Sequence, residues 1–94
     1  MGDCMRYMVV YDTDDDHIRG AIRETLKDMG GDHVQYSAFL ITLDSEEMLR
    51  LVRLIQEIIF GSDTDVRIIP ICKKDLQRME VYSTENEADV TDIF

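Results

Sequence analysis

The first residues able to do chemistry are the acids that follow an apolar run near the N-terminus. The run Met8–Tyr11 is apolar or aromatic, and Asp12 is the first charged residue after it. A carboxylate at the end of a buried strand is held by a rigid element and still reaches solvent, which suits a catalytic group or a metal ligand. The next acids, residues 14–16, instead suit the N-terminus of a helix. Asp12 is therefore the candidate catalytic and metal-binding residue, and capping or simple solvation is the open alternative.

The elements that must position Asp12 follow from the spacing of apolar residues. The pattern predicts strands over residues 5–11, 65–72 and 79–82, helices over 15–29 and 45–60, and two short strands or one bent strand over 33–38 and 39–43. Residues 73–76 are expected to form a turn or a single helical turn. This order is β-α-β-β-α-β plus one extra C-terminal strand, which predicts an α+β, ferredoxin-like fold with strand order 4-1-3-2.

Length and charge limit what the chain does. Its 94 residues carry 20 acids against 10 Lys and Arg, a net charge of -10. We expect one domain over residues 1–82 and a flexible acidic tail over 83–94. Such a charge disfavours binding along a phosphate backbone unless the bases are gathered on one face.

The sequence also predicts the compartment and the state of the cysteines. No apolar stretch approaches the roughly 20 residues of a membrane helix, and Met1–Met5 carries no signal peptide, so no membrane contact and a cytoplasmic location are expected. Cys4 and Cys72 are too few for a disulfide scaffold or a complete zinc site. Free, mostly buried thiols are expected, although a bridge between these two cysteines is geometrically possible in the predicted fold.

Several segments together resemble a known family. They occur in the order Tyr11–Asp16, Arg19, Val34–Phe39 and Arg67–Cys72. In sequence and spacing they are similar to the CRISPR-associated protein two family, and the similarity spans about residues 5–82. The tyrosine-aspartate strand end combined with the valine-glutamine-tyrosine-serine segment is more specific than either motif alone.

The resemblance implies a homodimer and a role in CRISPR adaptation. In the family, the aspartate matching Asp12 faces its symmetry mate across the two-fold axis, and a strand matching residues 79–82 pairs with the partner's sheet. The shared role is that of a central dimer that joins copies of the CRISPR integrase, CRISPR-associated protein one, while DNA lies across the assembly. Metal-dependent ribonuclease or deoxyribonuclease activity is attributed to some members. That chemistry implies Mg²⁺ or Mn²⁺ at Asp12.

Carried over residue by residue, the resemblance also implies contacts with nucleic acid. Arg19 matches the family pattern, Arg23 lies one helical turn beyond it, and His33 stands where the family usually has arginine. The family's second arginine is replaced by Ala21 in this chain. These departures weaken the case for cleavage of free nucleic acid more than the case for the fold.

Three further residues support the site in this interpretation: Tyr11, Ser37 and Phe39. For Ser37 and Phe39, a corner hydroxyl and a core side chain are the alternative interpretation.

Three functions remain open, and the first is favoured. It is a dimeric scaffold for the integration of new DNA spacers. The second is a metal-dependent endonuclease acting on RNA or DNA through Asp12, whether CRISPR-associated or toxin-type. The third is a ligand-binding regulatory dimer, because a ferredoxin-like fold alone does not fix function. The chain has no glycine-rich phosphate loop to support this third function.

Overall fold

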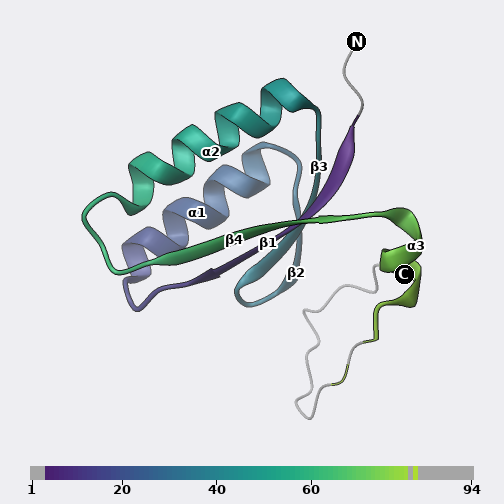
Figure 1. Cartoon of the computed structure of the whole chain (residues 1–94). Helices are drawn as coiled ribbons and strands as arrows, with labels where there is room; N and C mark the ends of the chain where they lie inside the picture. The colour runs from purple at the N-terminus through teal and green to yellow at the C-terminus, as the bar shows by residue number, and fades with distance from the viewer. Residues whose placement is uncertain (1–3, 81, 83–94) are drawn as a thin grey trace.

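A central strand, paired on both sides, organises the chain. The computed structural model describes residues 4–80 and 82, and within them the sheet order is β2-β3-β1-β4 with every neighbouring pair antiparallel. The elements are β1 Met5–Asp12, α1 Asp16–Asp28, β2 Asp32–Gln35, β3 Ala38–Leu43, α2 Ser45–Ile59, β4 Asp65–Ile71 and α3 Lys73–Arg78. Helices α1 and α2 lie side by side on one face of the sheet (Figure 1). The predicted ferredoxin-like α+β fold and its strand order are confirmed.

Alternation along β1 divides its side chains between two faces. Val9 and Tyr11 point toward the helices and are buried in the main core. Met8 and Val10 point to the opposite face. Because the period is two residues, Asp12 belongs to this opposite face as well.

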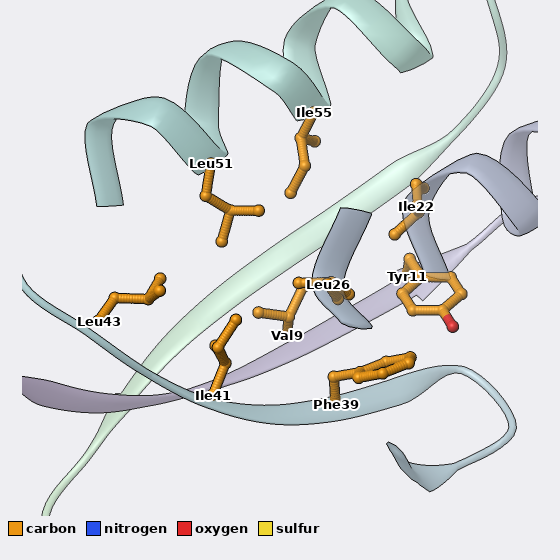
Figure 2. Packing of buried hydrophobic residues seen from close by; sticks show 9 residues of the cluster. All are labelled: Val9, Tyr11, Ile22, Leu26, Phe39, Ile41, Leu43, Leu51 and Ile55. Carbon is orange, nitrogen blue, oxygen red and sulfur yellow. The ribbon is translucent and has the colours of Figure 1, made fainter. Parts of the chain in front are cut away.

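The main core lies between the sheet and the two long helices. Leu51 and Ile55 reach from α2 toward Ile41 and Leu43 of β3, and Tyr11 lies close to Phe39 (Figure 2). Its nine buried members are Val9, Tyr11, Ile22, Leu26, Phe39, Ile41, Leu43, Leu51 and Ile55. A core of this size is ordinary for a small domain. The free energy of unfolding is therefore modest, and a single mutation in the core can remove a large part of it.

Side-chain caps fix where the helices begin. The Asp15 carboxylate accepts hydrogen bonds from the backbone N–H groups of His17 and Ile18, at 2.8 and 3.2 Å. Asp44 and Glu47 form a reciprocal capping box at the start of α2, with bonds of 2.8 and 2.9 Å. The prediction that an acid after Asp12 caps the first helix is therefore confirmed for Asp15.

Two predicted boundaries differ from the structure. The segment 33–43 is a hairpin whose turn lies at Tyr36–Ser37, so the break comes before Ala38 rather than after it. A register shift between His33 and Gln35 places the irregularity of the pairing on β2. Residues 73–78 form the helix α3, slightly longer than the single turn expected.

The extra strand expected over residues 79–82 is not formed by Met79, Glu80 or Tyr82 in this single chain. The prediction assigns that strand to the sheet of a partner subunit, where its hydrogen bonds would be made, and it stays a prediction. The predicted acidic tail, residues 83–94, lies outside the described residues. The C-terminal boundary of the domain therefore also stays a prediction.

The sheet face opposite α1 and α2 is apolar, and we call it the open face. Its buried members are Val34, Ala38 and Leu40, and four partly buried residues pack against them: Met8, Val10, Ile71 and Leu76. Ile69 stands directly opposite Met8 in the ladder and is 47% exposed. Of the described helices, only the short α3 contributes a residue to this face.

Other sequence predictions can be checked directly. Cys4 and Cys72 are free, as expected, but the expectation that the two thiols are mostly buried is wrong, because both are exposed. Pro70 lies in β4, an edge strand of this sheet, where its missing N–H is tolerated. Within residues 4–80 and 82, no helix is long and apolar enough to span a membrane.

Candidate metal and nucleic-acid site

Asp12 lies at the exposed end of β1, directly opposite another carboxylate. Its partner in the antiparallel ladder is Asp65, the first residue of β4, and both side chains are exposed. Like charges directly opposite each other on neighbouring strands are destabilising. Asp65 also forms an exposed ion pair with Arg67, with Arg67 Nε and Asp65 Oδ2 3.0 Å apart.

Further acids surround this pair. Asp12, Thr13, Asp14, Asp63, Thr64 and Asp65 line one shallow depression, and we call its four aspartates the acidic end of the sheet. Carboxylate oxygens are suitable donors for Mg²⁺, which often uses only one or two of them and keeps several waters. Among residues 4–80 and 82, however, no three His, Cys, Asp or Glu side chains are grouped to hold a metal ion. The described part of one chain thus offers oxygen donors but not a complete metal site.

A hydroxyl network holds the two loops of the acidic end together. Thr13 is buried, and its Oγ1 lies 2.9 Å from Oγ1 of Thr64. Ser62 Oγ lies 2.9 Å from the Thr64 hydroxyl, and the Asp15 N–H donates to Thr13 Oγ1 at 3.2 Å. These bonds join the loop after β1 to the loop before β4. They fix the loops that adjoin Asp12 and Asp65 relative to each other.

Arg19 contacts the β1–α1 loop in this structure. Its guanidinium donates to the backbone oxygen of Thr13, forms an ion pair with Asp16 and lies 5.2 Å from the centre of the Tyr36 ring. Its side chain is only 16% exposed. These contacts give Arg19 a structural role, and its predicted contact with nucleic acid stays a prediction.

The three predicted supporting residues meet near the β2–β3 turn. Tyr11 is 1% exposed, and its N–H donates to the Ser37 oxygen at 3.0 Å. Its hydroxyl lies at the outer edge of the core (Figure 2) and donates to the Tyr36 oxygen at 3.4 Å. Phe39 is fully buried, with its ring centre 6.4 Å from that of Tyr11. Phe39 thus packs in the core, as the structural alternative expects, whereas Ser37 contacts Tyr11 through its backbone oxygen rather than through the hydroxyl.

His33 and Arg23, the other predicted nucleic-acid residues, lie beside the same aromatic group. The His33 ring stacks on Phe39 with 4.6 Å between ring centres, and its Nε2 lies 3.3 Å from the Tyr36 oxygen. Arg23 is partly buried, and its Nε is buried with no hydrogen-bond partner among the described residues. Both residues pack along the edge of the core rather than projecting freely, and their contact with nucleic acid stays a prediction.

Because Tyr11 is buried, we expect its ionisation to lower the stability of the fold at alkaline pH. Removal from water raises the pKa of Tyr11 above its usual value of 10.0, although the positive charge of Arg23 acts in the opposite direction. Above about pH 10 the unfolded chain loses this proton while the folded chain retains it. We therefore expect the free energy of unfolding to fall as pH rises from about 10 toward the folded-state pKa.

Denaturant titrations between about pH 8 and 11 check this expectation. Tyr11→Phe removes the titrating group and should flatten the decline, whereas Tyr36→Phe, at a site 66% exposed, should not. Equal pH dependence in wild type and Tyr11→Phe would show that Tyr11 does not control alkaline stability.

The sequence reasoning missed Thr13, Asp63 and Asp65 as parts of the site. A signal for Asp65 was present, because the predicted strand order makes the strands over residues 5–11 and 65–72 antiparallel neighbours. The end of one must then lie beside the start of the other. Thr13 had no comparable signal, since its role depends on a side-chain contact with residue 64, 51 positions away.

Residues 5–79 match the model of the family described as CRISPR associated protein Cas2. The chain belongs to the Cas2 family. It is 33% identical over 76 residues to a CRISPR-associated endoribonuclease Cas2 of Korarchaeum cryptofilum, which covers 81% of this chain and 82% of that protein. A Desulforudis audaxviator protein of the same name is 34% identical over 73 residues, which cover 78% of this chain and 69% of that protein.

Solved structures agree with the Cas2 assignment at the level of fold. A hypothetical protein from Thermus thermophilus superposes with a TM-score of 0.74 at 28% identity, covering 86% of this chain and 93% of that one. Streptococcus pyogenes Cas2 gives a TM-score of 0.70 at 23% identity, covering 84% of this chain and 100% of its own length. The overall fold is thus shared with a solved Cas2 structure.

Proposed function

We propose that this chain serves CRISPR adaptation as a dimeric scaffold that binds Cas1 and holds DNA for integration. Membership of the Cas2 family supports the adaptation role. A chain of a solved partial Cas6-RT-Cas1–Cas2 complex shares the fold, with a TM-score of 0.67 over 82% of this chain and 83% of that one at 20% identity. The composition of that complex motivates Cas1 as the partner.

The open face supports the dimer. Met8, Val10 and Ile71 are partly buried and form an apolar surface to which α1 and α2 make no contribution. Ile69 adds a side chain that is 47% exposed in the single chain. Burying such a surface against a second copy removes apolar area from water and adds to the modest core of a small domain.

The acidic end is the observation that favours a scaffold over a nuclease. Four aspartates surround the position where a phosphodiester would have to approach Asp12. Arg19 is already paired with Asp16 and hydrogen-bonded to Thr13, and Arg67 is paired with Asp65. A polyanion approaching Asp12 would meet repulsion with little compensation from those residues.

A metal-dependent endonuclease is the second candidate, because curated relatives carry the name endoribonuclease. In the proposed dimer, two Asp12 carboxylates would supply oxygen donors for Mg²⁺ or Mn²⁺. When bound, such an ion would neutralise charge on a phosphodiester. Asp12 and its neighbour Asp65 are the side chains of this chain that would hold it.

Cleavage assays separate the two candidates. We expect purified wild-type chain to leave single- and double-stranded RNA and DNA intact in Mg²⁺ or Mn²⁺, because the acidic end repels the backbone. The matched variant is Asp12→Ala, with Asp75→Ala as a control for loss of one exposed carboxylate elsewhere. Cleavage by wild type and Asp75→Ala that disappears in Asp12→Ala would establish the nuclease instead.

A further inference from the structure

Exposed positive charge is concentrated at the end of the sheet away from Asp12. β1 begins near Arg6, which pairs with Ile71 at the end of β4, whereas Asp12 pairs with Asp65 at the opposite end of the same ladder. Helix α3 follows β4 directly and adds Lys73, Lys74 and Arg78. We call these four exposed cations, Arg6, Lys73, Lys74 and Arg78, the basic end. Figure 1 shows α3 beyond the end of β4, apart from α1 and α2.

The geometry of α3 presents its charges outward. Leu76 packs against the apolar cluster of the open face and anchors the helix. Lys74 and Arg78 are four residues apart and share one face of the helix. That face lies nearly opposite Leu76, because two residues correspond to about 200° of rotation. The anchored helix therefore projects Lys74 and Arg78 into solvent.

These cations have no competing ion pair in the described part of the chain, where the ion pairs use Arg19 and Arg67. Residues 73–80 also hold two acids, Asp75 and Glu80, so the four cations leave a local net charge of +2. The Asp75 carboxylate accepts from the Cys72 thiol at 3.1 Å, and the Glu80 carboxylate accepts from the Tyr82 hydroxyl. The basic end is thus positively charged within a chain of net charge -10.

The composition of the basic end indicates the kind of partner. Protein interfaces are built around an apolar or aromatic centre. Helix α3 itself exposes no large apolar side chain, and the exposed Met5 and Tyr82 lie outside the helix. Interfaces with nucleic acid are more polar and more positive. A gathering of bases on one surface is also the condition under which an acidic protein can bind a phosphate backbone.

We propose that the basic end binds the phosphate backbone of duplex DNA. The inference rests on the proposed function, because it specifies where the scaffold holds its DNA. It moves the contact from Arg19 and Arg23, which pack against the protein, to α3 and the start of β1. Each protomer contributes one such surface, separated from its acidic end by the length of β1.

The test compares two double variants with the same loss of charge. Lys74→Gln/Arg78→Gln removes two cations of the basic end, and Arg50→Gln/Arg53→Gln removes two exposed cations of α2. Binding of a fluorescent duplex is measured by anisotropy at several KCl concentrations, for the chain alone and with Cas1. Circular dichroism checks that each variant is folded.

We expect the α3 variant to raise the dissociation constant roughly tenfold at low salt, and its salt slope to fall by about 0.9 for each phosphate that it no longer neutralises. The α2 variant should bind like wild type. Equal weakening in both variants, wild-type binding by the α3 variant, or no duplex binding by wild type with or without Cas1 would each overturn the inference. Normal DNA binding together with loss of Cas1 binding would assign the basic end to an acidic protein surface instead.

This outcome is separate from failure of the proposed function. If wild type supports integration but the α3 variant binds duplex normally, only the inference about the basic end is wrong. If integration proceeds without the chain, the scaffold function fails, and the anisotropy series still decides where DNA binds.

Discussion

Ile69→Lys should leave the chain folded and convert the proposed dimer into monomers. Ile69 is 47% exposed in the single chain and lies on an edge strand, where lysine is readily accommodated. In a dimer built on the open face, each protomer would bury one new ammonium group that has no partner. Burying an unpaired charge is costly, so we expect the dissociation constant of the dimer to rise roughly 100-fold or more.

Light scattering coupled to size exclusion measures this directly, since one chain has a mass of 10.9 kDa and a dimer twice that. Phe60→Lys is the matched control, because Phe60 is 89% exposed at the end of α2 on the helical side of the sheet. It should remain dimeric. A dimer that persists in Ile69→Lys at the same concentrations would place the interface elsewhere.

Phe39→Ala should give the largest loss of stability of any single truncation considered for this chain. The side chain is fully buried between the Tyr11 and His33 rings, with ring centres 6.4 and 4.6 Å away. Truncating a buried phenylalanine typically costs about 3–5 kcal/mol, a large part of the roughly 5–15 kcal/mol that holds a domain together. We expect Tm to fall by roughly 12 °C or more.

Thermal unfolding followed by circular dichroism checks the prediction. Leu49→Ala serves as the control, because Leu49 is 62% exposed and its truncation removes little buried surface. If Phe39→Ala cost no more than Leu49→Ala, the core assignment of Phe39 would be wrong, and a direct role at the site would become the better explanation for this residue.

Local patterns predicted most of the fold. The 3.6-residue spacing of Ile22 and Leu26 identifies the buried face of α1, and alternation in β1 separates Val9 from Val10. Asp44 with Glu47 three positions later predicts the start of α2, and the capping box is present. These signals depend on neighbours in the sequence, which is why they can be read without coordinates.

The site was predicted less completely because its contacts join distant residues. The exposed end of β1 at Asp12 follows from the sequence, but Asp65 becomes its neighbour only through the β1–β4 register. The charge of Arg19 suggests nucleic acid, whereas its side chain turns inward to the Thr13 oxygen and the Tyr36 ring. Sequence shows the type of a side chain, but its partners are set by tertiary packing.

The scaffold function is tested most directly by measuring spacer integration by the cognate Cas1 with the Asp12→Ala variant in place of the wild-type chain. Three reactions are compared: wild-type chain, Asp12→Ala and no chain, with dimerisation and Cas1 binding checked for the variant. A scaffold predicts that integration requires the chain and that Asp12→Ala supports it at close to the wild-type rate. A variant that dimerises and binds Cas1, yet integrates no better than the reaction without the chain, would show that the Asp12 carboxylate itself takes part in the chemistry.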